Sequence, residues 1–310
     1  MPYDSSPAPP PVGTAPLVTV RTHRWEGFPC ESRHVRTADP RIAPVLLVGG
    51  AFQNKEGWGR FERGFLAHGD VLTVDPPGWG AGGVLPERFG ADFLADALAH
   101  MVEESGLGRV NVLSGSYGTA IAYRMAQRHP HVLRKVVLLG TMRSIPEDSR
   151  APMDVTMGHL RAGRMREFAE CSADLLMNTD EPERVTRGAR VRENLVGRMS
   201  RLTALEAAQT YTNTRRLLVQ EMVDTQHPPD VPVLVATGEL DTFTTPALCR
   251  DMAAACRDSW FVQVADADHL VHLERTDETA DLACRFFAGR PLDDLPYSRG
   301  VERASSPAPP

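Results

Sequence analysis

Short apolar runs recur along the chain, and their apolar residues are consecutive instead of alternating with polar ones. Such runs are expected when helices cover both faces of a parallel sheet. Six runs are interpreted as core strands, at residues 44–50, 71–78, 110–115, 135–141, 232–238 and 260–266. Between them, helical spacing of apolar residues is found over 89–102, 117–129 and 246–256. This alternation predicts an α/β fold with right-handed crossovers and a mostly parallel central sheet flanked by helices.

Three segments depart from the alternation. PLVTVRTHRW and ESRHVRT near the N-terminus predict an antiparallel strand pair that joins the sheet. Residues 142–229 contain amphipathic helical segments and no strand-like run, which predicts a helical cap inserted into a core of residues 17–141 and 230–290. Both ends are rich in Pro, Ala and Ser, so we expect a disordered tail over 1–16 and a flexible tail over 291–310.

Charge and composition narrow the class of partner. The 310 residues carry a formal net charge of −6, so no large positive field is available to attract nucleic acid or an anionic membrane. No basic n-region with an apolar segment opens the chain, and no apolar run approaches the roughly 20 residues that span a bilayer. The five cysteines are scattered and odd in number, which is typical of reduced thiols. We therefore expect a cytoplasmic protein with a small-molecule substrate, and the oligomeric state stays open.

The end of the third core strand, NVLSGSYGTA, holds two serines that could be nucleophiles. A sharp strand-to-helix turn exposes its central side chain only if the residues two before and two after it are small. Ser116 meets this condition, with Ser114 before it and Gly118 after it. Ser114 does not, because Val112 would occupy the tight position. The pattern predicts that Ser116 is the exposed nucleophile.

A serine hydroxyl needs a base, and the base needs an acid to orient it. Asp241 follows the strand at 232–238, in the loop ELDTFTTP, and His269 follows the strand at 260–266, in ADHLVHLERTDE. Carboxyl ends of parallel strands share one edge of a sheet, so the three side chains are expected to meet there. Asp266 and Asp268 are too close to His269 along the chain to orient it from the opposite side.

Residues 17–290 resemble the α/β-hydrolase superfamily. The segments VLLVGG, VDPPGWG, SGSYG, GELDTFTTP and DHLVHLERTDE stand in the order of that family's landmark segments. The resemblance implies that Ser116 is the nucleophile, His269 the general base and acid, and Asp241 the orienting carboxylate. It also selects His269 over His272, because the family histidine is followed five residues later by a glutamate, here Glu274.

The same resemblance implies an oxyanion hole made of two backbone N–H groups. One is the N–H of Tyr117. The other lies in the loop after VLLV, where the family's usual His-Gly-x is replaced by Val48-Gly49-Gly50-Ala51, so the donor is Gly50 or Ala51. Phe52, next in the loop, is expected to face the substrate or to pack structurally.

These residues predict a serine hydrolase that cleaves an ester, thioester or lactone of a small or medium molecule, with no cofactor and no metal ion. A serine aminopeptidase and a carbon–carbon bond hydrolase use the same triad, and a hydrolase-like receptor without activity is a further alternative. A serine in this strand-to-helix turn disfavours epoxide hydrolase and haloalkane dehalogenase chemistry, because the enzymes with that chemistry resemble this fold but have an aspartate at the same position. DADHLVH is not completed by a further metal-binding motif.

Overall fold

A single sheet runs through the molecule, and its strands carry the site residues at one edge. The computed structural model describes residues 17–305, so the tail predicted for 1–16 lies outside the described residues. The nine strands of the described sheet follow the order β1-β2-β4-β3-β5-β6-β7-β8-β9. Their bounds are β1 Val18–Trp25, β2 Phe28–Val35, β3 Val45–Val48, β4 Val71–Asp75, β5 Val110–Gly115, β6 Leu133–Leu139, β7 Val233–Gly238, β8 Asp258–Val264 and β9 Ser298–Ser305.

The predicted parallel core is confirmed. Strands β4, β3, β5, β6, β7 and β8 pair in parallel, while β1, β2 and β9 join the sheet antiparallel. Each core strand is apolar on both sides because helices cover both faces. In β3, for example, Leu46 and Val48 belong to one buried apolar cluster, and Val45 and Leu47 belong to another.

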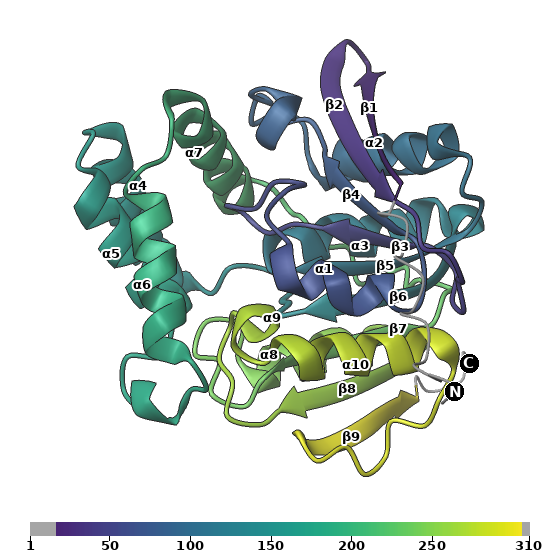
Figure 1. Cartoon of the computed structure of the whole chain (residues 1–310). Coiled ribbons are helices and arrows are strands. Elements are labelled where there is room, and N and C mark those ends of the chain that lie inside the picture. Colours follow the sequence, from purple (N-terminus) through teal and green to yellow (C-terminus); the bar gives the residue numbers. More distant parts are fainter. Residues whose placement is uncertain (1–16, 306–310) are drawn as a thin grey trace, which may run out of the picture.

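The helices divide between these two faces (Figure 1). Helices α2, α3 and α8 contribute to the cluster that contains Leu46, and α1 and α10 contribute to the cluster that contains Val45. The bounds of the core helices are α1 Gly59–Leu66, α2 Ala91–Ser105, α3 Tyr117–Arg128, α8 Pro246–Ala254, α9 Val271–Glu274 and α10 Thr276–Ala288. Short 3-10 turns lie at Gly80–Gly82, Pro130–Val132 and Pro182–Arg184.

Four helices and no strand lie in the segment from 142 to 229 that the sequence predicts to be a cap. They are α4 Glu147–Arg161, α5 Met165–Leu176, α6 Gly188–Met199 and α7 Ala204–Val219. Figure 1 shows α4, α5 and α6 grouped beside the sheet, with α7 returning toward the core. Phe168, fully buried, and Met199 belong to a small apolar core of this segment.

Helix α7 is bound to a core loop that has almost no regular structure of its own. Gln209 Nε2 donates to the carbonyl oxygens of Gly80 and Gly83, at 2.9 and 2.7 Å. Asn213 Nδ2 donates to Gly78 O at 2.9 Å. These carbonyl groups have no ladder partner, so the side chains of α7 supply the hydrogen bonds that a buried loop requires.

The structure corrects the prediction of a flexible tail over 291–310. Ser298–Ser305 form β9, which pairs antiparallel with β8, and only 306–310 of the predicted tail lie outside the described residues. The segment SRGVERAS lacks the consecutive apolar residues of the core strands because it lies at the edge of the sheet. Within residues 17–305, no helix combines the length and the apolar character that crossing a bilayer requires.

Candidate active site

Ser116 lies in a strained turn between β5 and α3. Its backbone has φ 50° and ψ −121°, outside the regions that non-glycine residues usually adopt. A Cβ atom on Gly118 would lie 2.6 Å from Gly49 O and 2.8 Å from Val48 O, so no larger residue fits there without displacement of the backbone. Ser114 is fully buried, and its hydroxyl donates to Val137 O at 3.3 Å. The turn therefore buries one serine and presents the other.

The structure brings together the three side chains that the sequence predicts to meet. His269 Nε2 lies 3.0 Å from Ser116 Oγ, and His269 Nδ1 lies 3.1 Å from Asp241 Oδ2. Each residue lies just beyond the carboxyl end of its strand, β5 for Ser116, β7 for Asp241 and β8 for His269. The hydrogen-bond chain runs from a partly buried hydroxyl to a fully buried carboxylate.

Asp241 accepts more hydrogen bonds than the one from His269. The hydroxyl groups of Thr237 and Thr244 donate to Oδ2 at 2.6 and 2.5 Å, and the backbone N–H groups of Phe243 and Thr244 donate to Oδ1 at 2.9 and 2.7 Å. Thr244 Oγ1 also lies 2.9 Å from His269 Nδ1. Neither threonine is predicted from the sequence as part of the site, although Thr244 stands within the segment ELDTFTTP.

This environment keeps Asp241 ionised. Burial alone would raise the pKa of its carboxyl, but the charge of His269 and the donated hydrogen bonds outweigh burial and lower it. For His269, burial would lower the pKa of the imidazole, and the charge of Asp241 raises it above its ordinary value. The pair therefore favours a protonated His269 whenever a proton arrives from the Ser116 side.

The loop that holds Gly50 and Ala51 lies against Ser116, since a Cβ atom on Gly50 would be 3.4 Å from Ser116 Cβ. The N–H of Tyr117 is the first of α3 and has no acceptor within its own helix. The Gly50 carbonyl accepts hydrogen bonds from Trp79 Nε1 at 3.0 Å and from Gln53 N at 3.3 Å. In a trans peptide the C=O and the next N–H point in opposite directions, so the N–H of Ala51 points away from Trp79. Of the two N–H groups that the sequence predicts as alternatives for the oxyanion hole, that of Ala51 is therefore the one on the side opposite Trp79.

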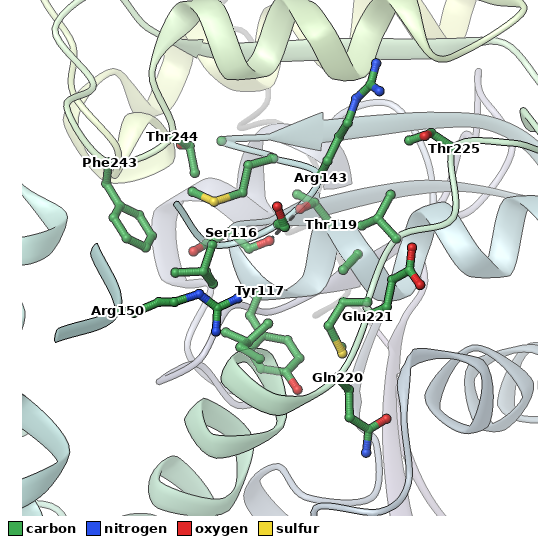
Figure 2. Close-up of a pocket in the computed structure, with 18 residues that line it drawn as sticks. Ser116, Tyr117, Thr119, Arg143, Arg150, Gln220, Glu221, Thr225, Phe243 and Thr244 are labelled. Carbon is green, nitrogen blue, oxygen red and sulfur yellow. Dashed lines mark hydrogen bonds between the residues drawn. The ribbon is translucent and has the colours of Figure 1, made fainter. Parts of the chain in front are cut away.

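Three cavities meet at Ser116. The largest, about 240 Å³, extends past Tyr117 and Phe243 toward Arg150 and Glu221 (Figure 2). A second, about 70 Å³, is mainly apolar and lies under the cap, where Met153, Met157, Leu175, Leu176 and Leu217 line it. A third, about 130 Å³, runs beside the His269 loop to His272 and Arg198. Phe52 lines the second and third cavities and packs on Phe168 of the cap, with ring centroids 6.2 Å apart.

His272 and Asp268, the alternatives to His269 and Asp241, lie in surroundings that differ from those of the hydrogen-bond chain. His272 packs against Trp58 and Phe61, with ring centroids 6.1 and 5.8 Å away, and burial lowers the pKa of its imidazole to about 4. Asp268 is fully buried and accepts a hydrogen bond from the backbone N–H of Asn178 in the cap. Glu274 is also buried, and its Oε2 accepts from Asp268 N at 2.6 Å.

Asn178 connects the cap to both loops that carry Asp241 and His269. Its backbone N–H binds Asp268, next to His269, and its side-chain Nδ2 donates to Leu240 O, next to Asp241, at 3.0 Å. Its Oδ1 accepts from Asp180 N and Glu181 N, both at 2.9 Å, which fixes the turn after α5. This residue is not predicted from the sequence, where it is one polar residue in a polar turn.

The chain has relatives among characterised proteins. A stretch of 107 residues is 30% identical to a poly(3-hydroxyalkanoate) depolymerase of Ectopseudomonas oleovorans, and it covers 34% of this chain and 38% of the relative. A 2-hydroxy-6-oxononadienedioate/2-hydroxy-6-oxononatrienedioate hydrolase of a Pseudomonas species is 28% identical over 113 residues, 35% of this chain and 40% of that one. The chain thus matches about two-fifths of the length of these curated relatives.

Solved structures share the fold at low identity. An α/β hydrolase named MGS-M2, from a Medee basin deep-sea metagenome library, superposes with a TM-score of 0.75 at 16% identity, covering 89% of this chain and 100% of that one. The enol-lactonase of Burkholderia xenovorans LB400 gives a TM-score of 0.73 at 19% identity, with 86% and 99% covered. The family model for the alpha/beta hydrolase fold matches residues 43–276, which span the parallel strands β3 to β8, the cap helices and all three residues of the hydrogen-bond chain. This chain belongs to the α/β-hydrolase family.

Proposed function

We propose that the protein cleaves an ester, thioester or lactone of a small or medium molecule through an acyl-enzyme on Ser116. The observation that carries this proposal is the continuous hydrogen-bond chain from Ser116 Oγ through His269 to Asp241. Ser116 Oγ attacks the carbonyl carbon while His269 Nε2 takes its proton. The proton then passes from His269 to the leaving oxygen or sulfur. Asp241, held ionised, stabilises the imidazolium in between.

The second half of the reaction uses the same groups. Water attacks the acyl carbon and gives a proton to His269, and the bond to Ser116 Oγ breaks as the hydroxyl recovers that proton. In both halves the carbonyl oxygen becomes an oxyanion, for which Tyr117 N–H and Ala51 N–H are the proposed donors. The three cavities at Ser116 provide space for the two sides of the scissile bond and for the incoming water.

The lining charges support a neutral or anionic substrate over a peptide with a free amino terminus. A serine aminopeptidase needs acidic side chains to bind the substrate ammonium group. Of the described residues that line the three cavities, one is acidic, the exposed Glu221, and three are arginines, Arg143, Arg150 and Arg198. Figure 2 shows the guanidinium of Arg150 directed into the largest cavity.

A carbon–carbon bond hydrolase is the second candidate, because hydrolases named for oxononadienedioates match about a third of the chain at 28–33% identity. Turnover of a vinylogous 1,5-diketone, compared with turnover of p-nitrophenyl and lactone substrates of similar size, separates the two activities. Faster turnover of the diketone would replace the ester assignment while leaving the roles of Ser116, Asp241 and His269 in place.

The test of the nucleophile uses both serines of the turn between β5 and α3. Ser116→Ala should abolish p-nitrophenyl ester turnover and labelling by a fluorophosphonate, because no other group takes the place of the attacking oxygen. Ser114→Ala is the matched control: it removes a buried hydroxyl in the same turn and keeps a small side chain, so activity should be retained. Full activity in folded Ser116→Ala contradicts the assignment, and absence of labelling in the wild type favours a receptor without activity.

A further inference from the structure

Trp79 contacts both sides of the proposed oxyanion hole. It lies in the loop after β4 and is 4% exposed. Its indole Nε1 donates to Gly50 O at 3.0 Å, and that carbonyl belongs to the peptide whose N–H is carried by Ala51. Its ring meets the Tyr117 ring edge to face, with centroids 5.0 Å apart and planes at 75°. One side chain therefore touches the peptide of one donor and the side chain of the other.

The orientation of the Gly50–Ala51 peptide is not enforced by regular structure. It lies in a loop between β3 and α1, and a glycine on one side lowers the barrier to rotating the peptide plane. If the plane rotated, a carbonyl oxygen would replace an N–H beside Ser116 and would repel the developing oxyanion. The N–H of Ala51 donates to no acceptor among the described residues, so the hydrogen bonds on its far side, at Gly50 O, hold the plane in place.

We propose that Trp79 is a positioning residue that keeps the oxyanion hole formed, by holding Gly50 O through its indole N–H. This inference rests on the proposed function of Ser116. The Trp79 loop is itself fixed: Ala81 N donates to the buried Asp75 at 3.0 Å, and α7 of the cap binds the carbonyl groups of Gly78 and Gly80. Helix α7 of the cap thereby supports the proposed oxyanion hole through this loop.

Tyr117 receives support from the same helix. Arg216 of α7 is fully buried and donates to Tyr117 Oη at 3.2 Å, to Asn213 Oδ1 at 2.6 Å and to Leu85 O at 2.8 Å. The side chain next to the nucleophile is thus clamped between Trp79 and Arg216. The 76–86 loop and α7 together thus contact the residues of both proposed donors.

The experiment compares two tryptophan replacements of equal burial. Trp79→Phe removes the indole N–H that binds Gly50 O and keeps an aromatic ring. Trp58→Phe is the matched control, because Trp58 is also 4% exposed and its Nε1 has no hydrogen-bond partner among residues 17–305. We expect Trp79→Phe to lower kcat for a p-nitrophenyl ester about 10- to 100-fold with little change in KM, less than the roughly 10²–10³-fold cost of deleting a donor outright. Trp58→Phe should keep kcat within a few-fold of the wild type.

A third variant separates the hydrogen bond from packing. In Trp79→His, the imidazole Nε2 takes the position of the indole Nε1 on a five-membered ring, while the benzene ring is lost. If Trp79 acts through its hydrogen bond to Gly50 O, kcat should be higher for Trp79→His than for Trp79→Phe. If it acts through packing alone, the order should be reversed, because phenylalanine fills more of the space. Thermal unfolding of each variant checks that it is folded.

Every outcome of these measurements either supports or overturns the proposed role of Trp79. Equal kcat in Trp79→Phe and Trp58→Phe overturns the role of Trp79, as does a lower kcat in Trp79→His than in Trp79→Phe. If Trp79→Phe does not fold, kcat of Trp79→His within about tenfold of the wild type supports the proposal, and a larger loss overturns it. A wild type that neither labels with a fluorophosphonate nor hydrolyses esters overturns the proposed function, and this inference with it.

Discussion

His269 depends on Asp241 for both its orientation and its basicity. The Asp241 carboxylate is surrounded by donors, so it stays charged in a place where burial alone would favour the neutral acid. Its charge raises the pKa of His269, against the lowering effect of burial. Thr244 Oγ1 touches both groups and closes a triangle of hydrogen bonds. The ring is therefore held at Nδ1 and free to exchange a proton at Nε2.

Replacing Asp241 by Asn should lower kcat about 10³–10⁴-fold, because the amide cannot stabilise the imidazolium. The acidic limb of the pH–rate profile should also move to lower pH. The base is active when neutral, and without the Asp241 charge the burial of His269 lowers its pKa, so the neutral form persists to a lower pH. A kcat/KM profile between pH 4 and 9 measures the shift.

Asp266→Asn is the matched control for this substitution. Asp266 lies on the same loop as His269, and its carboxylate pairs with Arg299 at the surface, at 3.1 Å. Its replacement should leave both kcat and the position of the limb unchanged. An acidic limb that stays in place in Asp241→Asn would mean that Asp241 does not set the pKa of His269.

The residues at the site that can be predicted from the sequence are those whose chemistry demands one residue type at one position. Ser116 needs small neighbours, and Asp241 and His269 follow strand ends that meet at one edge of the sheet. Trp79 and Asn178 could not be predicted in the same way, because each acts by a hydrogen bond to a distant backbone carbonyl, at Gly50 and at Leu240. Such a bond leaves no local pattern around either partner.

The turn after α5 connects the cap to the loops that carry Asp241 and His269. Asn178 is 8% exposed, and Nδ2 supplies the hydrogen bond to Leu240 O, beside Asp241. Asn178→Ala should lower the free energy of unfolding by about 1–3 kcal/mol, because a buried carbonyl loses its donor and the turn loses its acceptor. It should also lower kcat about tenfold by loosening the loop that carries Asp241. Urea unfolding and ester kinetics measure the two effects.

Asn194→Ala is the control within the same cap. Asn194 lies on α6 with an exposed side chain, so its loss should change stability by less than about 0.5 kcal/mol and leave kcat unaltered. If Asn178→Ala loses stability but keeps the wild-type kcat, the turn holds the cap without positioning the catalytic loops.

The elements themselves were predictable in proportion to their burial. Strands β3 to β8 lie under helices on both faces, so their apolar runs stand out in the sequence. The edge strand β9 has no such requirement on both faces, so the pattern of SRGVERAS does not predict a strand. The cap could be predicted as helical from its periodicity, but its attachment could not, because Gln209, Asn213 and Arg216 bind backbone carbonyls of a loop more than a hundred residues away.

The buried acids beside His269 couple the stability of the folded chain to pH. Burial raises the pKa of Glu274 to about 8 and that of Asp268 to about 6. An acid with a raised pKa in the folded state binds its proton more tightly there than in the unfolded chain. Its contribution to stability therefore grows as pH falls from the raised value toward the ordinary one, at roughly 1.4 kcal/mol per pKa unit. Other groups oppose this trend, since the neutral His272 disfavours folding below its ordinary pKa.

Comparison of Glu274→Gln with the wild type isolates one of these groups. Above pH 8 the wild type buries a charge at this position and the variant does not, so Glu274→Gln should be the more stable protein at pH 9. As pH falls from 9 to 5, Glu274 gains its proton in the folded state and the advantage should shrink by several kcal/mol. Glu183→Gln, at an exposed position, should keep a constant difference from the wild type over the same range. Parallel stability curves for Glu274→Gln and the wild type, measured by urea unfolding between pH 5 and 9, would show that Glu274 is ionised throughout, and that the loop of His269 is held by a charged acceptor instead of a neutral one.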